Sequence, residues 1–361
     1  MRTVASPYMH WAKICSSARY NLATSGLMSY PLAKLPVSLD QLELTRGGGY
    51  GYAPLVEAIA AHERVSPRNV VTATGTSMAN HLAMAAILEP GDEVLVERPA
   101  YELLLSVLEY LRADIHRFER RERDGWALDP DAVGCAMTPR TRLIVTTNLH
   151  NPAGVLAGQA ELAAIGALAR RNGARVLVDE VYLDAVFDGG PGTAFLLGEE
   201  FVTTNSLTKV YGLSGLRCGW ILADEKLATQ IYRLDDLFGV NPAYPAELLS
   251  CAAFANLGKI RAGARDLLER NREVLNLFLA TRGDLAVMPQ RWGTVVFPRL
   301  LTGSVDAFCR LLREKYETSV VPGSFFEMPE HFRIGTGGGT EALVAGLERL
   351  GAALDEFGAR G

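Results

Sequence analysis

The stretch NSLTKVYGLSGLRCGW, residues 205–220, follows directly on an apolar segment that predicts a β-strand over residues 201–205. It places Lys209 among hydroxyl-bearing and small residues, with Arg217 eight positions further along. Two other polar motifs also close apolar segments, NLHNPAG over residues 148–154 and VDEVY over residues 178–182. Because a parallel α/β sheet binds its ligands outside the carboxyl ends of its strands, the three motifs predict one shared site.

Strands and helices alternate on both sides of this stretch. Predicted strands cover residues 93–97, 115–118, 142–147, 175–179, 201–205 and 216–223, and predicted helices cover residues 77–88, 101–111 and 159–171. Such alternation is typical of βαβ units and predicts an α/β fold in which helices flank a mostly parallel sheet.

The pattern changes near residue 243. Long helical stretches run to about residue 279, and short strands (286–288, 294–298, 319–321, 332–334) and helices (305–315, 340–357) follow. We therefore expect a large domain over residues 46–242. An interdomain helix and the C-terminal part, residues 243–361, should form a smaller α+β domain together with an irregular N-terminal segment, residues 1–45.

The composition excludes several classes of protein. Of the 361 residues, 48% are hydrophobic and 21% are charged, which is too apolar for a disordered chain. The net charge of −5 argues against a nucleic-acid partner. No apolar run approaches the ~20 residues that cross a bilayer, and the N-terminus lacks the apolar core of a secretory signal. We expect a cytoplasmic protein that does not bind a membrane.

Several familiar motifs are absent from the sequence. It contains neither a phosphate-binding P-loop nor the glycine fingerprint of dinucleotide-binding proteins. The glycines at 212 and 215 do not have the spacing of a nucleophile elbow. The six histidines never pair at metal-ligand spacing, and the five cysteines are scattered, so we expect no metal site.

The ordered motifs resemble the class I and II aminotransferases, the fold type I enzymes that use pyridoxal 5′-phosphate (PLP). The resemblance extends from about residue 20 to residue 334, nearly the whole chain. It implies a large PLP-binding domain, a smaller domain and a homodimer.

The resemblance assigns the central chemistry to residues at the predicted strand ends. Lys209 matches the Schiff-base lysine, and the chain has only six lysines against 30 arginines. Asp179 matches the carboxylate that pairs with the pyridine nitrogen of PLP, where a buried carboxylate would find the partner it needs. Tyr182 and Asn151 match the two donors to the 3′ oxygen of PLP. Glu180, next to Asp179, is interpreted as structural.

Other residues match the family's cofactor ligands. The phosphate would be held at a strand-to-helix turn, where a helix N-terminus offers free N–H groups, and by a planar guanidinium. The matching residues are Gly75, Thr76, Ser77, Ser206 and Arg217. Tyr101 matches the aromatic side chain that stacks on the pyridine ring.

The substrate side is less clearly marked. Arg333, in the segment FRI after PGS, resembles the arginine that grips the substrate α-carboxylate. Gly26 lies in NLATSG, which resembles the strip that folds over the substrate. Tyr8 and Trp11 are candidates either for the entrance or for simple packing.

One position departs from the family pattern. Many members place a tyrosine five residues before the glycine that leads into the first helix, and it reaches the partner subunit's phosphate. Counting back from Gly51 gives Arg46 here. Either Tyr50 or Arg46 could take this part.

The resemblance implies an aminotransferase that moves an amino group from an α-amino acid to a 2-oxo acid, by way of a Lys209 Schiff base and pyridoxamine phosphate. The motifs equally serve other PLP reactions on amino acids, such as β/γ-elimination, cyclisation or replacement. A non-catalytic PLP-binding regulator is the third hypothesis. The sequence does not indicate which amino acid is used.

Overall fold

A computed structural model describes residues 5–289 and 291–359. Its centre is a seven-stranded sheet in the order β2-β8-β7-β6-β5-β3-β4. β8 runs antiparallel to both of its neighbours, and the other neighbours pair in parallel. The strands are β2 (Val70–Thr74), β3 (Glu93–Arg98), β4 (Asp114–Glu119), β5 (Thr141–Thr147), β6 (Arg175–Asp179), β7 (Phe201–Ser206) and β8 (Cys218–Leu222). The predicted α/β fold with a mostly parallel sheet is confirmed.

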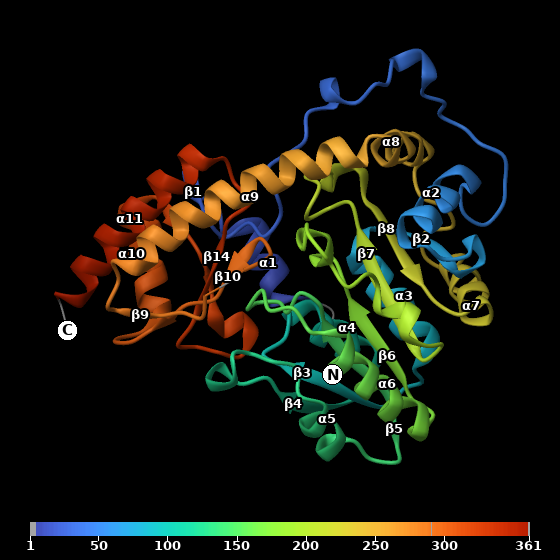
Figure 1. Cartoon of the computed structure of the whole chain (residues 1–361), viewed down its shortest axis with the longest axis horizontal. Helices are drawn as coiled ribbons and strands as arrows, with labels where there is room; N and C mark the ends of the chain where they lie inside the picture. The colour runs from blue at the N-terminus through green and yellow to red at the C-terminus, as the bar shows by residue number, and fades with distance from the viewer. Residues whose placement is uncertain (1–4, 290, 360–361) are drawn as a thin grey trace.

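Helices cover both faces of this sheet (Figure 1). They are α2 (Ala53–Glu63), α3 (Gly75–Ile87), α4 (Glu102–Leu111), α5 (Pro130–Ala136), α6 (Gln159–Asn172) and α7 (Glu225–Asp235). Alternate residues of one strand serve opposite faces: Leu143 and Val145 belong to the core under α3, α4 and α7, and Ile144 to the core under α5 and α6. This alternation explains why the strands read as continuous apolar runs.

A second set of elements follows at the C-terminal end. α8 (Tyr244–Ala255) leads into the 24-residue α9 (Leu257–Ala280), which runs from the large sheet to the C-terminal elements (Figure 1). There α10 (Val305–Tyr316) and α11 (Thr340–Gly358) pack with short strands. These strands are β9 (Leu285–Ala286), β10 (Val295–Val296), β11 (Arg299–Leu300), β12 (Thr318–Ser319), β13 (Val321–Pro322) and β14 (Phe332–Gly335). β1 (Tyr20–Asn21) pairs in parallel with β12, so the N-terminal segment joins the C-terminal part.

The prediction that residues 1–45 are irregular is wrong for α1 (Pro7–Ile14). Ser6 caps this helix by accepting a hydrogen bond from the backbone N–H of Met9 at 3.1 Å, and Pro7 occupies its first turn. A helix this short is marginal by itself, so packing against the rest of the protein decides it. α5 and α7 were also not among the predicted elements.

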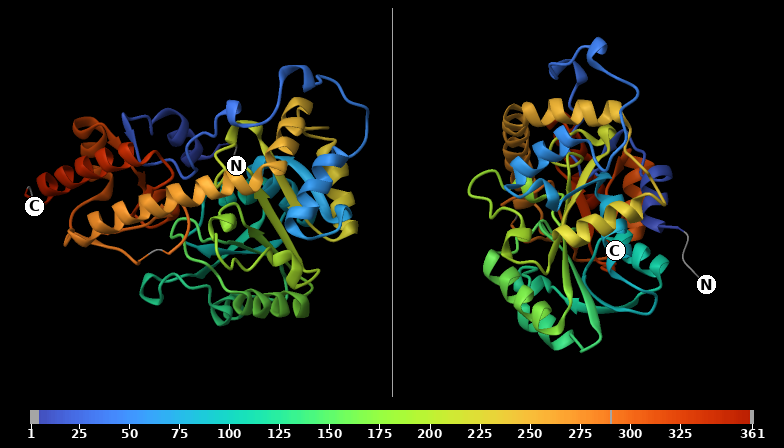
Figure 2. Two further views of the ribbon diagram at one scale, coloured as in Figure 1. Left: turned by 45° about the horizontal axis from the view of Figure 1, so that its top comes forward. Right: turned by 90° about the vertical axis from the view of Figure 1, so that its right-hand side faces the viewer.

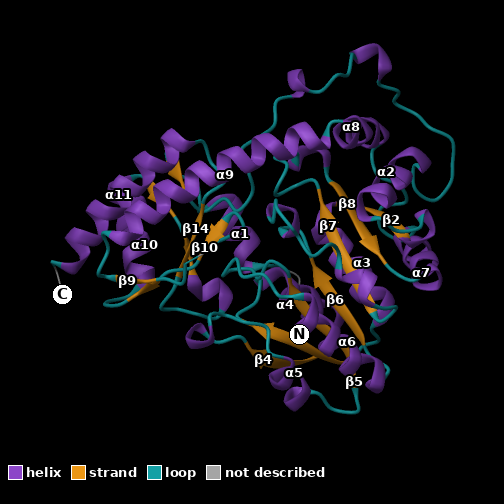
Figure 3. Cartoon of the chain, viewed as in Figure 1, coloured by secondary structure: helices purple, strands orange, loops and turns teal. Residues whose placement is uncertain are grey.

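Between β1 and α2 the chain leaves the body of the protein. Apart from the short 3-10 turns at Leu32–Lys34 and Leu39–Gln41, this segment is a long loop that extends beyond the body in two views (Figures 2 and 3). Leu44 is 83% exposed on it. No helix in the described part of the chain is long and apolar enough to cross a bilayer.

Candidate active site

The carboxyl ends of β5, β6 and β7 meet the N-terminus of α3 and one side of α1 around a cavity of about 290 Å³. Its walls contain nine of the predicted site residues: Thr76, Ser77, Tyr101, Asn151, Asp179, Tyr182, Ser206, Lys209 and Arg217. Tyr8 and Trp11 also line it, which places them at the cavity instead of in packing elsewhere. The structure therefore brings residues from 8 to 217 into one site.

Lys209 follows β7 and projects into this cavity. Its Nζ donates a hydrogen bond to Ser25 Oγ at 3.0 Å, and no carboxylate of the described residues pairs with it. Burial lowers the pKa of the Lys209 amine below its usual value. Gly26 packs beside it, because a Cβ there would lie 3.5 Å from Lys209 Cδ. The amine is thus enclosed and more easily deprotonated than a surface lysine.

Asp179 ends β6 with its carboxylate held in a fixed position. Asn80 Nδ2 donates to Oδ2 at 2.8 Å, and the Val181 N–H donates to Oδ1 at 3.1 Å. Thr204 Oγ1 in turn donates to Asn80 Oδ1 at 2.6 Å. Burial raises the pKa of Asp179 to about 6, although the hydrogen bond from Asn80 opposes the shift. A buried carboxylate of this kind is ready to pair with a cationic ring.

The N-terminal end of α3 forms a cradle beside Arg217. Gly75 has φ +75°, and a Cβ there would overlap the Arg217 guanidinium. Arg217 donates to Thr74 O at 3.3 Å and pairs with no carboxylate of the described residues. The buried hydroxyl oxygens of Thr76 and Thr208 have no partner in the described structure. Free hydroxyls, a cation and a helix N-terminus together suit a phosphate.

Arg333 lies at the other end of the site and is fully buried. Its NH1 donates to Asn151 Oδ1 at 3.0 Å, and its NH2 donates to the Tyr8 hydroxyl at 2.9 Å. Arg333 itself does not line the cavity, whereas Asn151 and Tyr8 do. Its Nε is buried without a partner among the described residues. Its NH2 also donates to Ala23 O at 3.3 Å, so the guanidinium is held behind the wall by three neutral groups, with no carboxylate of the described residues to pair with its charge.

Two tyrosines lie near the predicted ring position. Tyr182 follows β6 and is 3% exposed, and burial raises the pKa of its hydroxyl. Tyr101 precedes α4 and meets the Tyr8 ring edge-on, with centroids 5.5 Å apart. Both rings are fixed before any ligand enters.

The two candidates for the partner's phosphate both lie outside this chain's own cavity. Arg46 forms an ion pair with Glu247 at 3.0 Å. Tyr50 is 55% exposed and donates to Asp236 at 2.8 Å. Which of the two meets a partner subunit stays a prediction.

Sequence reasoning missed several polar residues that line the cavity, and three of them contact or neighbour predicted site residues. Ser25 binds Lys209, Asn80 binds Asp179, and Thr147 lines the cavity beside Asn151. Asn80 could have been found, since it lies four positions after Thr76 on one helix and so on the same helix face. Ser25 and Thr147 carried no such signal, because single hydroxyl residues are common near strand ends.

The comparisons with known proteins agree with this geometry. The family model of aminotransferase class I and II matches residues 38–350. The chain is 29% identical to capreomycidine synthase of Streptomyces vinaceus, over 97% of this chain and 94% of that protein. It is 31% identical to a probable N-succinyldiaminopimelate aminotransferase of Mycobacterium tuberculosis, over 77% of this chain and 74% of that protein.

Among solved structures, a PLP-dependent aminotransferase from Streptococcus suis superimposes with a TM-score of 0.93 at 24% identity, covering 99% of both chains. This likeness shows the fold, and the family match shows the chemistry. The chain belongs to the class I and II aminotransferases and is a PLP-dependent aminotransferase.

Proposed function

We propose that Lys209 binds PLP covalently and that the cavity holds the cofactor between Asp179 and Arg217. The residues fit the group. The unpaired Arg217, the orphaned Thr76 hydroxyl and the cradle at Gly75 suit its phosphate, with Ser77 and Ser206 beside them. Near the predicted position of the ring nitrogen, Asp179 is a buried carboxylate with no cationic partner in hydrogen-bonding contact among the described residues.

When bound, PLP supplies an electron-withdrawing ring that weakens the bonds at the α-carbon of an attached amino acid. Asp179 would hold a proton on the ring nitrogen. Tyr182 and Asn151 would donate hydrogen bonds to the 3′ oxygen, and Tyr101 would pack against the ring. Lys209 Nζ, whose pKa burial lowers, would act as the base that takes the proton from the α-carbon of the substrate.

The substrates we propose are an α-amino acid and a 2-oxo acid that share one binding mode. Arg333 would bind the α-carboxylate together with the Tyr8 hydroxyl, and Gly26 would leave room beside Lys209. The observation that carries this proposal is the Arg333 guanidinium, which is buried without a carboxylate partner among the described residues. A charge in that position needs an anion.

We also propose a cytoplasmic homodimer, with the domain division at residues 45/46 and 242/243 given above. The dimer is supported by the extended loop and by a set of exposed apolar side chains, Leu32, Leu44, Leu237 and Val240. The phosphate end is open in the single chain, where Ser77 and Arg217 are exposed. A second copy would cover such surfaces.

Borohydride reduction of the yellow holoenzyme tests the attachment. Peptide mapping should find the reduced cofactor on Lys209. Label on any of the other five lysines would overturn the site assignment.

One observation favours a second candidate, a cyclase that keeps the amino group on its product. The match to capreomycidine synthase spans 97% of the chain, against 77% for the aminotransferase named above. Product analysis separates the two. With the amino donor alone, transamination yields a 2-oxo acid and an aminated cofactor, whereas cyclisation yields a cyclic amino acid and leaves the cofactor unchanged.

A further inference from the structure

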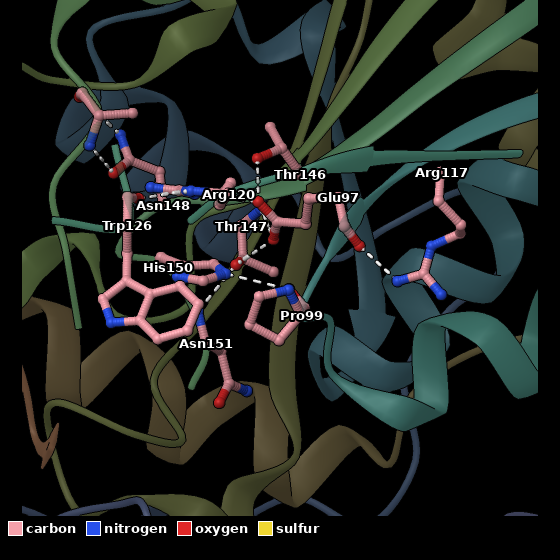
Figure 4. A network of polar contacts seen from close by, with 11 residues as sticks. Glu97, Pro99, Arg117, Arg120, Trp126, Thr146, Thr147, Asn148, His150 and Asn151 are labelled. Atoms are coloured by element: carbon pink, nitrogen blue, oxygen red, sulfur yellow. Dashed lines mark hydrogen bonds and ion pairs between the residues drawn. The ribbon is translucent and has the colours of Figure 1, made fainter. Parts of the chain in front are cut away.

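A buried ion pair lies behind the wall of the active site that carries Asn151 (Figure 4). Glu97, near the end of β3, and Arg120, just after β4, have side chains that are 0% exposed, and Arg120 NH1 lies 2.9 Å from Glu97 Oε2. Neither residue lines the cavity. Such a pair adds little net stability, because desolvation offsets the attraction, but it fixes the geometry of the groups bound to it.

The Glu97 carboxylate is saturated with donors. Oε2 accepts from Arg120 NH1 and from Thr146 Oγ1 at 2.6 Å, and Oε1 accepts from the N–H and the Oγ1 of Thr147 at 2.8 and 2.6 Å. Burial alone would raise the pKa of Glu97, but His150, Arg120 and the two threonine hydroxyls outweigh it and hold that pKa below its usual value. The carboxylate is therefore ionised and can only accept.

The ionised Glu97 carboxylate fixes the direction of the hydrogen bond between Thr147 and Asn151. A threonine hydroxyl has one proton, and Thr147 gives its proton to Glu97, so its oxygen is left as the acceptor for the Asn151 N–H at 2.9 Å. Asn151 lies in a turn outside any helix or strand. Its Oδ1 accepts from Arg333 at 3.0 Å, which turns its Nδ2 hydrogens away from Arg333 and leaves them for a cavity ligand.

We propose that Glu97, clamped by Arg120, is a positioning residue that holds Asn151 through Thr147 Oγ1 and thereby sets the place of Arg333. The donor to the cofactor and the group that binds the substrate carboxylate then share one rigid support. The inference rests on the proposed function, because the spacing of Asn151 and Arg333 matters only when a cofactor and an amino acid occupy the cavity.

The test compares two near-isosteric variants of one strand. In Glu97→Gln, the amide NH2 must face either the Thr147 N–H or the Arg120 guanidinium, and neither group can accept a hydrogen bond. The variant therefore loses its hydrogen bond either to Thr147 or to Arg120. Glu93→Gln is the matched control. Glu93 begins the same strand, is 1% exposed and accepts from Thr138 and Thr141 hydroxyls at 2.8 and 2.5 Å, but lies at the opposite end.

Hydrogen exchange of the holoenzyme is the first measurement. Amides in peptides covering residues 148–157 should exchange about tenfold faster in Glu97→Gln than in wild type, and Glu93→Gln should match wild type there. The second measurement is steady-state kinetics. Glu97→Gln should lower kcat/KM for the amino donor about 10- to 100-fold, mainly through KM, because misplacing a binding group by about 1 Å has this cost.

A third measurement reports on the cofactor. The pH midpoint of its visible absorption should shift in Glu97→Gln and stay in place in Glu93→Gln, because only the former disturbs Asn151. If Glu97→Gln does not fold, Thr147→Val cuts the same link while Glu97 keeps Arg120 and Thr146, and the same three changes are expected.

Equal exchange, KM and absorption in the Glu97 and Glu93 variants would overturn the inference. A wild-type protein that neither binds PLP nor converts an amino acid would overturn the proposed function. In that case the exchange comparison, made on the cofactor-free proteins, still decides whether Glu97 supports Asn151.

Discussion

The proposed cofactor end and the proposed substrate end of the site are built in different ways. At the cofactor end, Asp179, Ser206 and Lys209 come from the ends of two adjacent parallel strands, and Thr76 begins a helix that packs on the same sheet. At the substrate end, Tyr8 on α1 meets Arg333 on β14, two residues 325 positions apart in the chain. The cofactor end therefore depends on one sheet, and the substrate end depends on how α1 packs against β14.

The ionisable groups at the two ends also differ. Lys209 and Asp179 have pKa values shifted by burial, toward the neutral amine and the neutral acid. Arg333 stays charged and is held by neutral oxygens. The cofactor end is therefore prepared for proton movement and the substrate end for binding an anion. Substitutions at the two ends should separate these tasks.

Lys209→Met should have the largest effect. Without the amine there is neither covalent attachment nor a base for the α-carbon proton, and turnover should fall by more than ~10⁴-fold. Half-reaction kinetics measure it. Lys226→Met, at an exposed lysine outside the cavity, is the control and should behave as wild type; equal losses in both variants would remove Lys209 from its assigned role.

Asp179→Asn should keep PLP on Lys209 but lower kcat about 10²- to 10³-fold, since it removes the charge that holds the ring proton. The neighbouring Glu180→Gln is the control. Its carboxyl group accepts from the Ala194 N–H at 2.7 Å, and burial raises its pKa well above the usual value, so an amide changes little charge. Near-normal turnover of Asp179→Asn would contradict the assignment.

The same variant predicts a pH dependence of the cofactor-free protein. Burial raises the pKa of Asp179 from 3.8 to about 6, so its ionisation costs more free energy in the folded protein than in the unfolded chain. The stability that the protonated carboxyl group contributes is therefore lost as the pH rises from about 4 to 6. The free energy of unfolding of Asp179→Asn, measured relative to wild type, should rise by about 1.5 kcal/mol from pH 5 to pH 8, because only wild type carries the ionisable group. Urea titrations at both pH values measure it, and a pH-independent difference would contradict the shift.

Arg333→Lys should act on substrate and spare the cofactor. The charge remains but the planar pair of donors is lost, so KM for an amino donor should rise about 10- to 100-fold with PLP content unchanged. An amine that lacks a carboxylate should react equally with both forms. Loss of PLP with normal carboxylate kinetics would place Arg333 at the cofactor end instead.

Tyr8→Phe should have the smallest effect and refine the picture of the substrate end. It removes one hydrogen bond to Arg333, so KM should rise about 3- to 10-fold. The rise should disappear with a carboxylate-free amine. A large fall in kcat at unchanged KM would mean that Tyr8 serves the proton transfer and not the anion.

The sequence by itself determined the cofactor end. Strand periodicity placed Asp179 and Lys209 at strand ends, and the carboxyl ends of parallel strands necessarily share one edge of the sheet. The resemblance then supplied the chemistry. The resemblance also assigned Gly75 and Arg217 to the phosphate, and the structure places the two residues side by side.

Only the tertiary structure decided the rest. α1 was predicted as irregular because its eight residues carry little propensity of their own, and packing against the aromatic side chains of the site makes it a helix that brings Tyr8 to Arg333. The contacts of Ser25 with Lys209 and of Glu97 with Thr147 join residues 184 and 50 positions apart. Such pairs depend on which helices, strands and loops pack together, and a local sequence pattern does not determine that packing.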